Sequence, residues 1–155
     1  MNLAPLLRAV NEQPHAAAGR TRVGIDIVQI SRIADSVAQF GDRFTQRLFT
    51  PSELAYATAV PSLAAERLAA RFAAKEAAFK AFELSEAGID WRELEVRRLE
   101  DGACRLVLHG KAAKCAGAHD NEAALSLSHD GDYAIAVVAA TDIPNPSLSN
   151  PSVSP

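Results

Sequence analysis

The segment RFAAKEAAFKAF, residues 71–82, has the composition of a helix but carries charged side chains on its apolar side. On a helical wheel Glu76 falls between Phe72 and Phe79, and Lys80 follows one turn later on the same side. The lysine could be no more than the i+4 partner of the glutamate, worth about 0.2–0.5 kcal/mol on a solvated face. We expect this face to be packed rather than solvated, so the lysine could instead neutralise charge on a phosphate.

A second carboxylate stands in an apolar setting on a different element. Asp26 lies in the run VGIDIV, residues 23–28, whose residues indicate a strand that is buried on both faces. An isolated buried carboxylate is costly, so it needs a cation, hydrogen-bond donors or an exposed sheet edge. Asp26 could cap the following helix or pair with an arginine. Together with Glu76 it favours a site for Mg²⁺, which takes one or two protein carboxylates and completes its shell with water and phosphate oxygens.

The histidine of the segment SLSHDGD, His129, is either an ordinary turn residue or a donor to a phosphate. Motifs that are missing narrow the chemistry. The chain has no G-x-x-x-x-G-K-[ST], no G-x-G-x-x-G, no H-E-x-x-H and no G-x-S-x-G motif. These absences disfavour a P-loop nucleotidase, a Rossmann cofactor site, a zinc protease and a hydrolase elbow. The residues therefore favour a magnesium-assisted transfer from a phosphate-bearing substrate.

Composition indicates one globular domain in residues 21–140. The chain has 155 residues, 48% of them hydrophobic and 23% charged, with a net charge of -3, which disfavours nucleic acid as the main partner. It has two cysteines without metal-ligand spacing, and no stretch resembling a signal peptide or membrane span, so we expect a reduced, cytoplasmic protein. Residues 1–20 should form a flexible extension, and the Pro/Ser-rich residues 141–155 a disordered tail.

The elements that must position these residues follow from periodicity and turn signals. A capping box of Thr50 and Glu53 starts a helix, with Pro51 at its first position. The expected order is β-α-α-α-β-β-α-β-β, an α+β domain with a mostly antiparallel sheet packed against a long helix. Its main parts are a strand at 22–28, a helix at 30–40, the long helix at 62–82, a hairpin turning at Asp101–Gly102, a short helix at 111–118 and a hairpin turning at Asp130–Asp132.

Four segments, in this order and spacing, resemble the holo-[acyl-carrier-protein] synthases, the small trimeric class of 4′-phosphopantetheinyl transferases: VGIDIVQISRI, RLFTPSEL, RFAAKEAAFKAF and SLSHDGDYAIAVV. The resemblance implies transfer of 4′-phosphopantetheine from coenzyme A to a serine of apo acyl carrier protein, with release of adenosine 3′,5′-bisphosphate. It implies Mg²⁺ ligands at Asp26 and Glu76, one of which takes the serine proton. Lys80 and His129 complete the implied catalytic set, and with Arg71 they are expected to bind coenzyme A.

The resemblance also implies a homotrimer whose active sites are shared between subunits. It implies a surface for the acidic carrier protein that includes Arg32, Arg43 and Arg47, which could otherwise be ordinary solvated arginines. Two segments depart from the family pattern near the expected coenzyme A site. ELSEAGIDW replaces a Gly-rich turn, and DGACR lacks the usual proline. Two alternatives stay open: the same chemistry on a polyketide or peptide synthase carrier domain, and a non-catalytic carrier-binding protein of the same fold.

Overall fold

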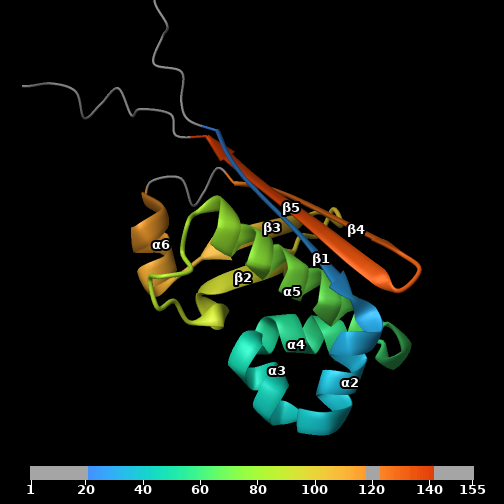
Figure 1. Ribbon diagram of the computed structural model, residues 1–155. Coiled ribbons are helices and arrows are strands. Elements are labelled where there is room, and N and C mark those ends of the chain that lie inside the picture. The colour runs from blue at the N-terminus through green and yellow to red at the C-terminus, as the bar shows by residue number, and fades with distance from the viewer. Residues whose placement is uncertain (1–20, 118–122, 142–155) are drawn as a thin grey trace, which may run out of the picture.

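The computed structural model describes residues 21–117 and 123–141, and it confirms an α+β fold (Figure 1). The extension expected at 1–20 lies outside these residues, and so does the tail expected at 141–155 apart from Thr141, which is the last residue of a strand. The elements are β1 (Thr21–Gln29), α2 (Ile30–Phe40), α3 (Asp42–Leu48), α4 (Pro51–Thr58), the 3-10 turn η1 (Pro61–Leu63), α5 (Ala64–Ala81), the 3-10 turn η2 (Trp91–Glu93), β2 (Leu94–Arg98), β3 (Cys104–Leu108), α6 (Gly110–Ala116), β4 (Ala124–Asp130) and β5 (Tyr133–Thr141).

The strands form two antiparallel sheets rather than one. The larger sheet has the order β1-β5-β4, and β2 pairs with β3 in the smaller one. Every strand pair in the described ranges is antiparallel, which confirms the expected sheet type. In the register of the larger sheet, Asp26 lies opposite Ala136 and His129 lies opposite Ala134.

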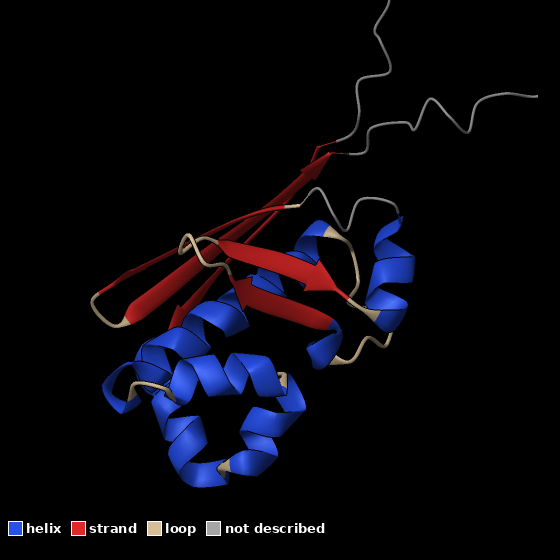
Figure 2. Cartoon of the chain, turned by 180° about the vertical axis from the view of Figure 1, so that it is seen from behind, coloured by secondary structure: helices blue, strands red, loops and turns tan. Residues whose placement is uncertain are grey.

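Helix α5 lies between the two sheets and forms the centre of the core (Figures 1 and 2). Its buried residues are mostly alanines, and these small side chains let both sheets approach its backbone. The closest approach is at Gly24 of β1, where an added Cβ would come within 1.9 Å of the Ala77 carbonyl oxygen. Any larger side chain at Gly24 would separate β1 from α5. None of the described helices is long and apolar enough to cross a bilayer.

The structure corrects the predicted helices at two places. Helix α3 was not expected, because only Thr45 and Leu48 in its seven residues are buried and the hydrophobic period is too short to read. The long helix begins later than predicted, since Pro61–Leu63 form a 3-10 turn before α5 starts at Ala64. The predicted capping box is confirmed. Glu53 N donates to Thr50 Oγ1 at 3.2 Å, and Thr50 N donates to Glu53 Oε2 at 2.8 Å.

Strand β1 is covered on only one face, so the expectation of burial on both faces is wrong for the single chain. The apolar side chains Val23, Ile25 and Ile27 are on its solvent-exposed face. They are 60%, 59% and 60% exposed. Because side chains alternate along a strand, Gly24 and Asp26 lie on the opposite face, toward α5. The Asp26 carboxylate thus lies on the face toward α5, whereas Ile25 and Ile27 face solvent.

The start of α2 is held by Asp132, not by Asp26. Asp132, in the turn between β4 and β5, accepts hydrogen bonds from Ser31 N at 2.8 Å and from Ser31 Oγ at 2.6 Å. A third bond comes from Gln29 Nε2 at 2.8 Å. These bonds, those from Ser31 above all, lower the pKa of the Asp132 carboxyl. Since Asp132 accepts the N–H group at the start of α2, Asp26 is free to bind a different partner.

Candidate functional site

Asp26 pairs with Lys80 across β1 and α5. Lys80 Nζ donates to Asp26 Oδ1 at 2.8 Å and to the carbonyl oxygen of Ile25 at 2.9 Å. The Lys80 side chain is 51% exposed, so it is not on a packed face as the helical wheel suggested. The lysine reaches past Glu76 to a strand far away in sequence. It is therefore a bridge between two elements rather than the partner of a glutamate on its own helix.

Glu76 lies half-buried beside this pair. Burial raises the pKa of its carboxyl, the negative charge of Asp26 raises it further, and Lys80 opposes both effects. Asp26 and Glu76 line one cavity of about 390 Å³, whose other walls include Arg32, Phe44 and Phe72. We call this the carboxylate cavity. Two carboxylates from different elements therefore face a single space, whose other walls are partly apolar and partly polar.

The carboxylate cavity fits a hard divalent cation. Burial and the negative charge of Asp26 raise the pKa of Glu76, and a bound cation would oppose both effects. In the described part of the chain no cluster of three or more His, Cys, Asp or Glu side chains could hold a metal by itself. Two carboxylates with open space beside them suit Mg²⁺, which keeps positions for water and phosphate oxygens. Asp26 and Glu76 are therefore the residues that would hold it.

Arg71 and His129 lie in a second cavity, of about 520 Å³. Arg71 is only 3% exposed, and its Nε atom is buried without a hydrogen-bond partner among the described residues. The guanidinium carbons of Arg71 and Arg67 lie 4.3 and 4.5 Å from the ring centroid of Tyr56, so both cations contact the same ring. His129 Nε2 lies 3.5 Å from Glu66 Oε1 at the same cavity. We call this the anion cavity, because two adjacent arginines and a histidine suit phosphate.

Within one chain, the predicted catalytic and coenzyme A-binding residues fall into two groups. Asp26, Glu76 and Lys80 lie together, whereas His129 and Arg71 belong to the anion cavity. Judged from the described residues, the two cavities have no lining residue in common. A single copy therefore does not bring the predicted site residues to one place.

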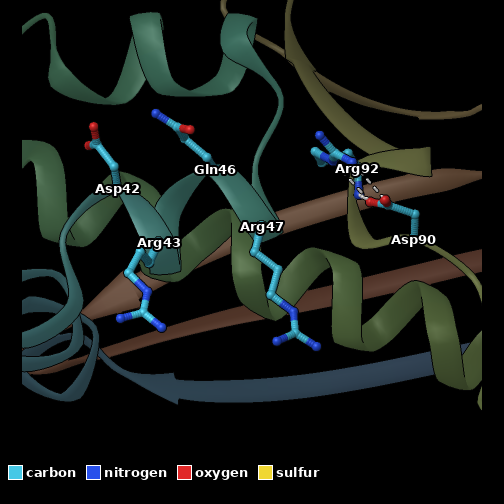
Figure 3. Close-up of a pocket in the computed structure, with 6 residues that line it drawn as sticks. All are labelled: Asp42, Arg43, Gln46, Arg47, Asp90 and Arg92. Atoms are coloured by element: carbon cyan, nitrogen blue, oxygen red, sulfur yellow. Dashed lines mark hydrogen bonds and ion pairs between the residues drawn. The ribbon is translucent and has the colours of Figure 1, made fainter.

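The three arginines expected to dock a carrier lie along neighbouring cavities. Arg32 lines the carboxylate cavity. Arg43 and Arg47 line an apolar cavity of about 570 Å³ that shares Phe44 and Phe72 with it. They also line a polar cavity of about 540 Å³ (Figure 3). In Figure 3 both side chains extend from α3 in the same direction. We call the carboxylate, apolar and polar cavities together the arginine groove.

Sequence reasoning missed several residues that shape these cavities. Trp91 stacks on Phe72 at 5.2 Å between ring centroids, and it closes one wall of the apolar cavity. Arg92 lines the polar cavity, paired with Asp90 at 2.8 Å. Arg67 was not singled out either, although its spacing of four from Arg71 places both on one side of a helix. That spacing is the one signal that could have found it.

Known proteins resemble this chain over most of its length. A family model described as the 4′-phosphopantetheinyl transferase superfamily matches residues 22–138. The chain is 48% identical over 121 residues to the holo-[acyl-carrier-protein] synthase of Koribacter versatilis, covering 77% of this chain and 96% of the relative. It is 43% identical over 123 residues to that of Dehalococcoides mccartyi, covering 77% and 97%.

Solved structures show the same likeness. The Chronobacterium ammoniagenes ACPS–CoA complex is 32% identical with a TM-score of 0.69, and the match covers 78% of this chain and 96% of that one. The Helicobacter pylori holo-[acyl-carrier-protein] synthase in complex with coenzyme A is 28% identical with a TM-score of 0.67, covering 76% and 98%. The chain is therefore an enzyme of the 4′-phosphopantetheinyl transferase superfamily and belongs to its holo-[acyl-carrier-protein] synthases.

Proposed function

We propose that this enzyme transfers 4′-phosphopantetheine from coenzyme A to a serine hydroxyl of apo acyl carrier protein, with Mg²⁺, and releases adenosine 3′,5′-bisphosphate. The observation that carries the proposal is the meeting of Asp26 and Glu76 in one cavity, beside Lys80. That arrangement supplies cation ligands and a positive charge at the same place. Relatives of this chain are holo-[acyl-carrier-protein] synthases, and two similar solved structures are complexes with coenzyme A. The cytoplasmic location stays a prediction from the sequence.

The residues of the carboxylate cavity divide the work. Asp26 and Glu76 would hold Mg²⁺, which when bound supplies a Lewis acid and a template for the pyrophosphate of coenzyme A. One of the two carboxylates takes the proton of the attacking serine hydroxyl. Lys80, already at hydrogen-bonding distance from Asp26, offsets negative charge on the departing phosphate. Phe44 and Phe72 exclude water from one side of the cavity, which strengthens these electrostatic interactions.

We further propose that the anion cavity binds the phosphates at the nucleotide end of coenzyme A. The support is the buried Nε of Arg71, which has no partner among residues 21–117 and 123–141. A buried donor without a partner is costly, and a phosphate oxygen would satisfy it. His129 at the rim would donate to the same group. This assignment gives Arg71 and His129 a common ligand.

The two groups of residues fit a site shared between copies of the chain. We propose a homotrimer in which the carboxylate cavity of one subunit and the anion cavity of its neighbour bind one coenzyme A. The open apolar face of β1, formed by Val23, Ile25 and Ile27, supports this arrangement because a second copy would cover it. Cyclic assembly would repeat the same shared site at each interface.

The carrier protein is proposed to dock along the arginine groove. Arg32, Arg43 and Arg47 would pair with acidic residues around the serine of the carrier, and the apolar cavity between them would take an apolar side chain. The groove includes the cavity of Asp26 and Glu76, and its apolar cavity adjoins that one at Phe44 and Phe72. A serine carried along it would arrive at the carboxylates.

The direct test is incubation of the full chain with coenzyme A, Mg²⁺ and an apo carrier protein, read by intact mass. We expect the carrier to gain one phosphopantetheine, and adenosine 3′,5′-bisphosphate to appear in equal amount. Chelation of Mg²⁺ should stop the reaction. Apo carriers from fatty-acid, polyketide and peptide synthases form parallel arms that identify the preferred substrate. A folded protein that modifies none of them, while a known transferase modifies all, would refute the proposed activity. Carrier binding without catalysis would then be the remaining function.

A further inference from the structure

Cys104 is a thiol in the wall of the anion cavity. It is the first residue of β3, half-buried, and it lies with Arg67 and Arg71 among the cavity's lining residues. The chain's other cysteine, Cys115, is exposed on α6 and is not among the residues that line this cavity. Both cysteines are free thiols. The two therefore differ in surroundings but not in oxidation state.

The cavity around Cys104 is built to receive an anion. Arg71 is 3% exposed and presents a buried Nε with no hydrogen-bond partner in the described part of the chain. The Cys104 sulfur is close enough to interact electrostatically with the Arg71 guanidinium. Arg98, the cross-strand partner of Cys104, adds another cation to the same wall. A small anionic molecule drawn into this cavity would meet the thiol.

We propose that Cys104 is a modification site, at which thiol–disulfide exchange with a small anionic disulfide closes the anion cavity to its nucleotide ligand. This inference rests on the proposed function, which assigns the cavity to the phosphates of coenzyme A. The Cys104 thiolate attacks one sulfur of the disulfide, forms a new S–S bond and releases the other half as a thiolate that takes a proton from solvent. Cys104 is oxidised, and the released half of the disulfide is reduced.

The adduct blocks the cavity for two physical reasons. It occupies part of a space of about 520 Å³, and its negative charge pairs with the arginines that the phosphates would otherwise contact. Reduction of the mixed disulfide restores the thiol and reopens the cavity. An adduct on Cys115 leaves the cavity unchanged.

The experiment uses two single-cysteine variants of the full chain, Cys115→Ser, which keeps Cys104, and Cys104→Ser, which keeps Cys115. Each is treated with glutathione disulfide, which is anionic, or with hydroxyethyl disulfide, which is neutral, and adducts are followed by intact mass. Binding of adenosine 3′,5′-bisphosphate is measured by calorimetry before treatment, after treatment and after reduction with dithiothreitol.

We expect the adduct on Cys104 to abolish nucleotide binding, reduction to restore it, and bound nucleotide to slow adduct formation. Glutathione disulfide should be favoured over the neutral disulfide more strongly at Cys104 than at Cys115, and the adduct on Cys115 should leave binding intact. An untreated protein that binds no adenosine 3′,5′-bisphosphate would overturn the assignment of the cavity and this inference with it. Unchanged binding after full modification of Cys104, or no adduct on Cys104 at all, would overturn this inference alone.

Discussion

Lys75 and Glu53 form an ion pair at 2.8 Å in which both side chains are 0% exposed. The pair joins α5 to α4, and further bonds extend to η2 and to the smaller sheet. Lys75 Nζ also donates to the carbonyl oxygen of Trp91 at 3.0 Å, and Glu53 Oε1 accepts from Val96 N at 3.0 Å. Burial lowers the pKa of Lys75, and Glu53 opposes that effect. Glu53 thus caps α4 and also fixes the orientation of α5 about its axis. Glu76 and Lys80 are on α5.

Removing one member of this pair should destabilise the fold strongly. Lys75→Met leaves Glu53 as an uncompensated buried charge, with an expected loss of about 3–5 kcal/mol in the free energy of unfolding. Urea unfolding followed by circular dichroism measures the change. The double variant Lys75→Met/Glu53→Gln should recover part of the loss, because the buried negative charge is then gone while an acceptor for Val96 N remains. A single variant as stable as the parent would show that the pair carries no net stability.

The two carboxylates should be essential for transfer but not for folding. Because Asp26→Ala and Glu76→Ala each remove a cation ligand, we expect transfer to fall by about 10²-fold or more. Calorimetric Mg²⁺ binding should weaken in step. The control is Glu86→Ala, which removes an exposed carboxylate. Full activity in a well-folded variant would remove that residue from the site.

Assembly should depend on the open face of β1. Ile25→Lys places a charge at a position that is 59% exposed in the single chain but covered in the proposed trimer. We expect light scattering to show the mass falling from three chains to one, and transfer to be lost with it. Val60→Lys, at another exposed apolar residue, is the matched control. A parent protein that is active as a monomer would contradict the shared site.

Stability should fall in acid because of Glu95. Burial alone would raise its pKa, but hydrogen bonds from Arg97, His109 and Ser52 outweigh it and lower the pKa from 4.5 to about 2. A depressed carboxyl pKa contributes stability above pH 4.5, and that contribution is lost as the pH falls toward 2. Since Arg97 and His109 are half exposed, we expect about 1–2 kcal/mol.

Glu95→Gln should therefore lower stability at pH 7 and flatten its dependence on pH between about 4.5 and 2. Urea midpoints measured across this range test the prediction. An unchanged acid slope in the variant would mean that another carboxyl controls the loss of stability.

Carrier docking should depend on Arg32 and on salt. Arg32→Glu reverses a charge beside the carboxylate cavity, and we expect KM for the carrier to rise by about an order of magnitude at low salt. KM for coenzyme A should stay constant, and the salt dependence of the carrier KM should diminish. Arg105→Glu, at an exposed arginine of β3, is the control. An unchanged carrier KM at low salt would leave Arg32 as an ordinary surface residue.

Local signals explain which parts of the fold could be predicted. The helix at Ile30–Phe40 has the predicted bounds, because four apolar residues mark one face, and the capping box at Thr50 was visible within four residues. Helix α3 lacked such a pattern. The buried partner of Glu53 could not be found locally, since Lys75 lies 22 residues away. Glu53 was recognised for the bond it makes nearby and not for the ion pair it makes at a distance.

The same limit applies to the candidate site. Asp26 and Glu76 stood out because each is a carboxylate in an apolar run, and the structure places them in one cavity. The partner of Lys80 was missed, because a helical wheel compares residues only within one helix, whereas Asp26 comes from a strand. His129 lines a different cavity from the two carboxylates. Which cavity a residue lines depends on how the helices and strands pack, and the spacing of residues in the sequence does not show this.

Gly24 sets the geometry of the carboxylates in a way that side-chain packing could not. At this residue the strand meets the helix main chain directly, with no room for a Cβ against the Ala77 carbonyl. Asp26 is two residues beyond this contact and Glu76 is one residue before it, so covalent bonds of the main chain connect both carboxylates to the same point. Substitutions elsewhere in the core that keep this contact and the Lys75–Glu53 ion pair can therefore change how stable the protein is while leaving the spacing of the two carboxylates the same. Any side chain at position 24 would instead move β1 away from α5 and change that spacing.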